Sequence, residues 1–212
     1  DYKVTGVQTC ALPIFIFDKI PDNVLSINAS NAISFGGKVN PIPYGLQRSM
    51  HPSDKRIEII QYMMDEREDI NPQNLLYVNH SVNTNVKERS GINEIFFDKD
   101  WAHVENQRVD FYQFLHKIKE HKFMICPIGN AIDCHRNWEV LYLRRVPVMK
   151  KHPYLEYLYS NYPVLFVDRY EDVTEELLIE NEHLYEQAQQ IDLSELTLPN
   201  FFDKIVNKSL GR

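Results

Sequence analysis

The sequence predicts an α/β fold, with a Rossmann-like parallel sheet covered by helices on both faces. Short apolar runs of strand length, such as residues 74–78 (NLLYV) and 122–126 (KFMIC), alternate with longer segments whose apolar residues recur at helical spacing. This alternation favours parallel strands, because each crossover helix returns over the sheet. The runs lack a polar face, as expected of strands that are buried on both sides.

The helices are indicated by apolar stripes and by capping residues. Ser53 can cap a helix that carries Ile57, Ile60 and Met64 on one side. A helix around residues 109–121 would place Lys119 on its exposed side. A strand, loop and strand are expected over residues 22–46, a helix over 87–97 and a helix through Trp138 and Leu141. Strands are expected at 146–149 and 164–167, with a short helix around 154–159 between them. The tail is expected to form a helix, a loop and a helix over 174–189 and 199–207.

The composition limits the domain count and the classes of partner. A chain of 212 residues that is 43% hydrophobic allows one good-sized domain but hardly two complete α/β lobes. The formal net charge is −7 and the basic residues are scattered among acids, so no nucleic-acid partner is expected. Cys10, Cys126 and Cys134 fit neither a disulfide framework nor a CxxC metal pattern, which favours a reduced compartment.

The first residues have a separate signature. Residues 4–14 (VTGVQTCALPI) resemble the conceptual translation of a widely used sequencing-library adapter, so residues 1–15 are expected to be an artefact. A native strand is the alternative, because residues 11–17 (ALPIFIF) are apolar. On the first interpretation, residues 16–48 are the remnant of an N-terminal lobe with its linker, and residues 49–212 form the lobe that carries the chemistry. Membrane association then stays unknown, because the native N-terminus is missing.

The most informative segment is residues 126–143 (CPIGNAIDCHRNWEVLYL), which runs from a strand through a Gly-Asn turn into a helix. Ligands of open parallel sheets bind at the carboxyl ends of the strands, where Gly129 would let the backbone approach a phosphate. His135, Arg136 and Glu139 share one helical stripe, and the helix start favours an anion. Cations there, with a carboxylate one turn deeper, suit a diphosphate and a ribose. The residues alone leave open that His135 or Arg136 simply covers the sheet edge.

Together with the YPVLFVD that follows, residues 126–150 resemble the C-terminal motif of exostosin-like glycosyltransferases. In that motif a turn with Pro and Gly leads through Arg and Glu into a helix and an Ile-Pro-Val strand. The segments PIPYGL, LLYVNHSVNTNVKER and LTLPNFFDKIVN resemble further parts of these proteins, so the resemblance covers roughly residues 24–207. One departure is Arg144-Arg145, where the family usually has a small residue or Gly.

The resemblance implies the C-terminal, nucleotide-sugar-binding lobe of a GT-B fold, and sugar transfer from a nucleotide-diphosphate donor to a glycan or other hydroxyl acceptor. It implies that Glu139 contacts the ribose and Arg136 the diphosphate. Asn79 and His80 are weaker candidates, and Arg89 is equally interpretable as an exposed helix cation. The remaining implied donor-binding residues are His135, Gly129 and Asn130, near the phosphates or the sugar, and Asn83, Thr84 and Arg89 in the earlier loop.

The expected chemistry needs no metal and no cofactor besides the donor, because no Asp-x-Asp-like pair follows a strand. A general base for the acceptor would come from the N-terminal lobe, so this fragment is expected to bind rather than to turn over. The alternatives are a sugar-nucleotide epimerase on the same scaffold and a non-catalytic nucleotide-binding or interaction domain, which the Arg144-Arg145 departure favours. The expected compartment is the cytoplasm, or the Golgi lumen in a eukaryote.

Overall fold

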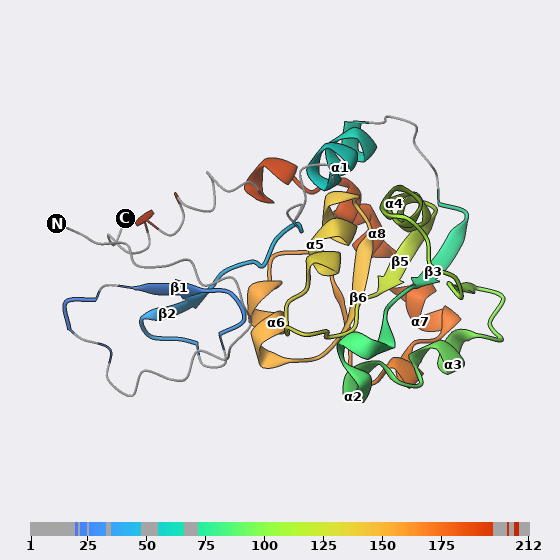
Figure 1. Ribbon diagram of the computed structural model, residues 1–212, viewed down its shortest axis with the longest axis horizontal. Coiled ribbons are helices and arrows are strands. Elements are labelled where there is room, and N and C mark those ends of the chain that lie inside the picture. Colours follow the sequence, from blue (N-terminus) through green and yellow to red (C-terminus); the bar gives the residue numbers. More distant parts are fainter. Residues whose placement is uncertain are drawn as a thin grey trace.

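The computed structural model describes residues 20, 22–24, 26–32, 35–47, 55–65, 72–196, 203, 206 and 207. Within these residues, five parallel strands form one sheet with helices on both faces, so the predicted α/β fold is confirmed (Figure 1). The adapter-like residues lie outside the described part. In order across the sheet, the strands are β4 (Ala102–Val104), β3 (Asn74–Val78), β5 (His121–Ile125), β6 (Val146–Lys150) and β7 (Leu165–Val167).

Two apolar cores hold the helices against the sheet, because successive strand residues point to opposite faces. Tyr77 belongs to one core, and its neighbours Leu76 and Val78 belong to the other. The first core packs beneath α1 (Arg56–Asp65), α4 (Phe111–Lys119), α5 (His135–Tyr142) and α6 (Pro153–Leu158). The second packs beneath α3 (Ile92–Phe96), η2 (Tyr170–Asp172), α7 (Glu175–Glu180) and α8 (Glu182–Gln189).

Shorter elements complete the described chain. A separate two-stranded pair, β1 (Ile27–Ala29) and β2 (Val39–Pro41), precedes α1 and agrees with the expected strand, loop and strand. The loop after β3 contains η1 (Val82–Thr84) and α2 (Val86–Arg89), and η3 (Leu193–Leu196) follows α8. No helix among the described residues is long and apolar enough to cross a membrane.

The strand order predicts where a ligand crevice would lie. The chain leaves β3 toward β4 on one side of it and later returns to β5 on the other side. The helices after β3 pack on one face of the sheet, and α5 after β5 packs on the opposite face. Between two such strands the loops part in opposite directions, and the crevice at their carboxyl ends is where open α/β sheets bind ligands.

Several local predictions differ from the structure. The expected helix over 87–97 is broken into α2 and α3 by Gly91, whose φ of 81° is left-handed. The expected helix over 174–189 is likewise two helices, α7 and α8, that meet at Asn181. Ile57 is 44% exposed, and Met63 joins Ile60 in the core in its place. Strand β4 was not predicted, because its three half-buried residues at the sheet edge carry no clear pattern.

The Arg144-Arg145 pair lies between α5 and β6, at the amino end of β6 and thus away from the carboxyl ends of the strands. Arg144 has a φ of 56°, the left-handed conformation that favours glycine. The buried Arg145 guanidinium donates to the carbonyl of Lys119 at 2.6 and 3.1 Å. Lys119 is itself buried and donates to the Met63 carbonyl at 3.2 Å, so its predicted exposure is wrong.

Candidate functional site

Two loops meet at the crevice and are joined by hydrogen bonds. The loop after β3 is tied to the loop after β5 by Asn85, whose side-chain amide donates to the Gly129 carbonyl at 2.9 Å. Arg89 spans the same gap, donating from Nε to the Ile128 carbonyl at 2.9 Å and from Nη2 to the Pro127 carbonyl at 3.0 Å. These contacts fix the ends of β3 and β5 relative to each other before any ligand is present.

Gly129 and Arg89, both predicted to contact the donor, contact each other. A Cβ atom at position 129 would lie 2.6 Å from Arg89 Nη2, too close for any other residue without a shift. Arg89 is 5% exposed and its third bond, from Nη1, reaches the Ser81 carbonyl at 3.0 Å. It is therefore not the exposed helix cation of the alternative interpretation. Its observed contacts brace the two loops, because three backbone carbonyls accept from its guanidinium.

Arg136 is the second residue of α5, the helix that follows the loop after β5. Its guanidinium carbon lies 5.6 Å from the centre of the Phe114 ring, and Nε is buried without a hydrogen-bond partner. No described residue accepts a hydrogen bond from this guanidinium. Arg136 is close enough to His80 and Arg89 to lower the pKa of both, which places it over the carboxyl ends of β3 and β5.

Glu139 lies one turn deeper in α5 and is 4% exposed. Burial raises the pKa of its carboxyl, and the nearby cations Arg136 and Arg56 oppose that shift. Among the described residues none donates a hydrogen bond to Glu139 and none forms an ion pair with it. The Glu139 oxygens are not among the fully buried atoms that lack a partner, so a ligand hydroxyl could reach them and donate to them.

His135, the first residue of α5, is already engaged by the segment that precedes α1. Its ring stacks on Tyr44 with centroids 4.2 Å apart, and Nδ1 lies 2.6 Å from the Gly45 carbonyl oxygen. Since a carbonyl only accepts, Nδ1 carries the proton and Nε2 is left as an acceptor. Burial lowers the pKa of His135, so the ring supplies no positive charge for a phosphate.

The remaining predicted residues stand at the rim of the crevice. Asn83 and Thr84 are exposed in η1, and the Thr84 hydroxyl donates to the Ser81 carbonyl at 2.9 Å. Asn130 is exposed in the loop after β5, next to the buried Gly129. The structure thus brings the predicted residues to the carboxyl ends of β3 and β5, where Arg136, Glu139 and the weaker candidate His80 have side-chain polar atoms that lack a described partner.

Asp133, which sequence reasoning did not select, organises the start of α5. The carboxylate is fully buried and accepts hydrogen bonds from Trp138 Nε1 at 2.9 Å and from the Tyr159 hydroxyl at 2.5 Å. The Tyr44 backbone N–H and the Asn137 amide donate to it at 2.7 and 3.2 Å. Burial raises the pKa of Asp133, and these donors oppose that rise. The only local signal for this role is the Asp at the end of a loop before a Trp-containing helix.

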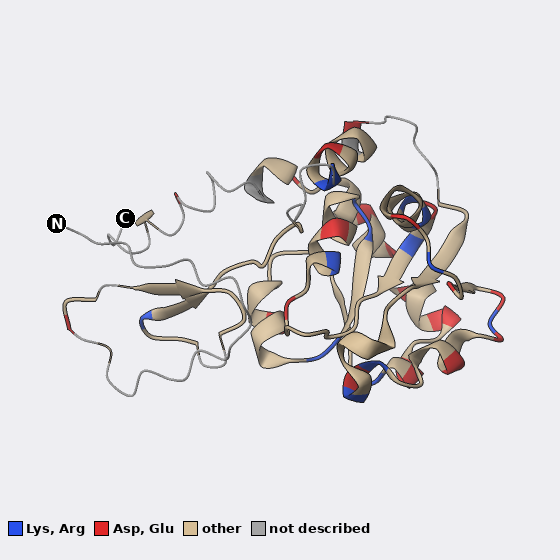
Figure 2. Ribbon diagram, in the orientation of Figure 1, with Lys and Arg blue, Asp and Glu red and all other residues tan. Residues whose placement is uncertain are grey.

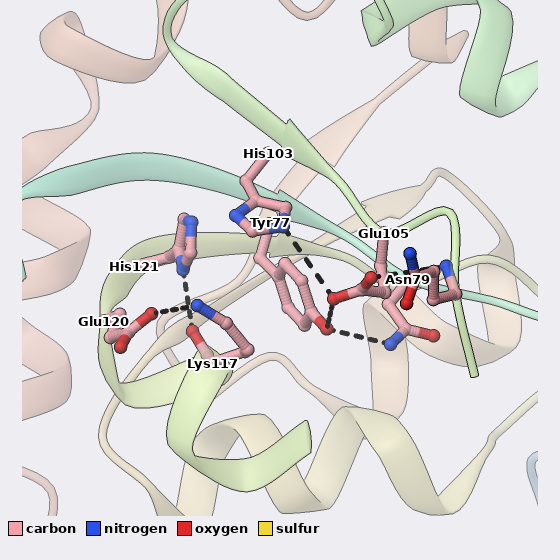
Figure 3. A network of polar contacts seen from close by, with 8 residues as sticks. Tyr77, Asn79, His103, Glu105, Lys117, Glu120 and His121 are labelled. Atoms are coloured by element: carbon pink, nitrogen blue, oxygen red, sulfur yellow. Dashed lines mark hydrogen bonds and ion pairs between the residues drawn. The ribbon is translucent and has the colours of Figure 1, made fainter. Parts of the chain in front are cut away.

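A second polar cluster lies beside the crevice on β3, β4 and β5 (Figure 3). Burial raises the pKa of Tyr77 to about 12, and its hydroxyl accepts from the Asn79 amide at 2.8 Å. Behind it, the His121 ring stacks on Tyr77, and Nδ1 donates to the Lys117 carbonyl at 2.7 Å. Burial lowers the pKa of His121 to about 4. The cluster runs from Asn79 and Glu105, which follow β3 and β4, to His121 at the start of β5, so only its first part lies at the carboxyl ends of the strands.

Comparisons with known proteins do not assign the chain to a family. No protein-family model matches it, and no curated protein is significantly similar to it.

The charged residues of the described part show neither a basic surface nor a metal site. The ribbon shows acidic residues and no Lys or Arg on α3 and α7, whereas α2 carries both signs (Figure 2). Within the described residues, no group of three or more His, Cys, Asp and Glu side chains is placed to hold a metal ion. Any proposal of function therefore rests on the residues at the crevice.

Proposed function

We propose that this chain is the nucleotide-sugar-binding lobe of an exostosin-like glycosyltransferase, and that the crevice between β3 and β5 receives the nucleotide diphosphate of the donor. One observation carries the proposal. At the start of α5, a guanidinium without an acceptor and a buried carboxyl without a donor lie one helical turn apart, where open α/β sheets bind ligands.

The chemistry of the two side chains fits a nucleoside diphosphate. The Arg136 guanidinium would bind phosphate oxygens, and its planar array of donors matches two oxygens at once. The first N–H groups of α5 add to this, because the N-cap residue Cys134 makes no side-chain cap bond to them. Glu139, one turn deeper, would accept hydrogen bonds from ribose hydroxyls.

In sugar transfer the nucleoside diphosphate is the leaving group, and negative charge develops on it as the glycosidic bond breaks. Arg136 and the helix N–H groups would stabilise that charge. The neutral His135 offers Nε2 as an acceptor, which suits a sugar hydroxyl better than a phosphate. The general base for the acceptor is expected from an N-terminal lobe. We therefore expect this chain to bind the donor without efficient turnover.

The test is isothermal titration with uridine and guanosine diphosphates and with the two nucleosides. One diphosphate should bind, and Glu139→Gln should weaken it by roughly 1–3 kcal/mol, the cost of spoiling a hydrogen bond to a charged group. Arg136→Ala should weaken the diphosphate much more than the nucleoside. Lys99→Ala is the control, because Lys99 is exposed just before β4, at the amino end of the strand and away from the carboxyl ends where the ligand would bind.

The pattern of losses decides between a ligand contact and a structural role. If Arg136→Ala lowers the thermal stability but leaves the diphosphate affinity intact, Arg136 is a brace at the sheet edge and the proposed site is withdrawn. The same withdrawal follows if wild-type protein binds neither diphosphate.

A further inference from the structure

His80 follows β3, and Arg136 lies at the start of α5 after β5, the neighbouring strand. Its Nε2 lies 3.2 Å from the Arg89 carbonyl oxygen, and Nδ1 is buried without a hydrogen-bond partner. Because the carbonyl only accepts, Nε2 carries the proton and Nδ1 presents an unused lone pair. Burial lowers the pKa of His80 to about 4, with Arg136 and Arg89 adding to the effect and Glu94 opposing it, so the ring is neutral near pH 7.

Arg136 has a buried donor without an acceptor, which complements the free acceptor of His80. Its Nε–H is a donor that is buried and unpaired, while the guanidinium rests over the Phe114 ring. Buried polar atoms without partners are rare in folded proteins, and each one is costly. Here an acceptor without a donor and a donor without an acceptor come from two loops of the same crevice, close enough for Arg136 to act on the His80 ring.

We infer that His80 is a positioning residue for Arg136, an inference that rests on the proposed diphosphate site. When the diphosphate is bound, the Arg136 Nε–H donates to His80 Nδ1, and the two terminal nitrogens of the guanidinium are then aimed at phosphate oxygens. Arg89 completes the arrangement, because its carbonyl holds the His80 ring in the required tautomer. The pairing satisfies both buried atoms and limits the orientations of the Arg136 side chain, which lowers the entropic cost of binding.

Two variants at position 80 test the roles of the two ring nitrogens one at a time. In His80→Asn the side-chain amide reaches the place of Nδ1 and keeps an acceptor there. In His80→Gln the amide reaches the place of Nε2, so the bond to the Arg89 carbonyl is kept and the Nδ1 acceptor is lost. The probes are uridine and guanosine diphosphates, the corresponding nucleosides and inorganic pyrophosphate, titrated near neutral pH.

His80→Gln should weaken the diphosphate and pyrophosphate about tenfold or more, the effect of one lost hydrogen bond to a charged group, and should change nucleoside affinity less than about twofold. His80→Asn should stay within about threefold of wild type. Arg136→Lys, which keeps the charge but lacks the Nε–H and the planar array of donors, should lose at least as much as His80→Gln. If His80→Gln does not fold, His80→Ala takes its place, because it also lacks the Nδ1 acceptor. In an Arg136→Ala background, His80→Gln should add nothing.

Equal losses for nucleoside and diphosphate would show that His80 only supports the fold, and would overturn the inference. The same holds if His80→Gln binds like wild type, or if its loss is fully additive with that of Arg136→Ala. In these cases a wild-type protein that binds the diphosphate leaves the proposed function standing. If wild type binds no diphosphate, the proposed function and this inference fall together.

Discussion

The hydrogen-bond cluster around Asp133 makes a quantitative prediction about stability. Replacing Asp133 with Asn keeps the shape of the side chain but turns one acceptor oxygen into a donor. The groups that face it are all donors, and Trp138 and Tyr159 are each only 1% exposed. One or two donors are therefore left unpaired, at roughly 1–3 kcal/mol each. We expect Asp133→Asn to lower the free energy of unfolding by about 2–5 kcal/mol, a large share of the total for a domain of this size.

Urea unfolding followed by tryptophan fluorescence measures this loss, since Trp138 stacks on Tyr159 with centroids 4.8 Å apart. A double-mutant cycle tests whether the Asp133 carboxylate and the Tyr159 hydroxyl interact. Tyr159→Phe should cost about 1–2 kcal/mol in wild type and much less beside Asp133→Asn, because the shared hydrogen bond is already disturbed. The matched control is Asp168→Asn, whose side chain is 73% exposed and paired only with Lys151, and which should change stability by less than about 1 kcal/mol.

Two results would refute this reasoning. One is an Asp133→Asn protein within about 0.5 kcal/mol of wild type, which is the range of an ordinary surface substitution. The other is full additivity between Asp133→Asn and Tyr159→Phe, because it would show that the hydroxyl and the carboxylate do not act on each other.

Two further perturbations test the neighbourhood of the site. Gly129→Ala should displace the Arg89 guanidinium and lower the free energy of unfolding by roughly 1–3 kcal/mol, measured by urea titration, and an unchanged midpoint would contradict the close approach. Burial lowers the pKa of His121 from the ordinary 6.5 to about 4, so the neutral form contributes stability that is complete above about pH 6.5 and is lost as the pH falls toward about 4. His121→Phe should flatten that part of the pH dependence of the urea midpoint, and an unaltered slope would assign it to other groups.

The strands were predictable where local sequence and tertiary environment agree. Residues 74–78 are an apolar run bounded by polar residues, and β3 occupies the same five positions. Strand β4 was missed because its three residues are half-buried at an edge, where neither alternation nor a continuous apolar run is required. The helix over 87–97 was predicted as one piece because helical spacing continues across Gly91, whereas the left-handed backbone there forces a break.

The site was predictable in part, for a related reason. The carboxyl ends of parallel strands meet at one edge, so residues after β3 and β5 were expected to come together, and they do. The partners of Asp133 lie far along the chain, with Tyr44 at a separation of 89 residues and Asn31 at 102. Contacts at such separations leave no spacing pattern in a single sequence, so the role of Asp133 was not accessible from it.

These contacts decide which of the predicted basic residues can still bind an anion, and they leave Arg136. Three predicted ligand contacts were basic, but Arg89 already donates to three backbone carbonyls, and burial lowers the pKa of His135 although its hydrogen bond to the Gly45 carbonyl opposes that shift. The negative charge of a diphosphate would therefore be met by Arg136 and by the start of α5. Because these two contributions come from one helix, whatever fixes that helix also fixes the anion site. Asp133 immediately precedes its N-cap residue and binds the backbone of the preceding segment at Tyr44, so a shift of that segment would move the anion site with it.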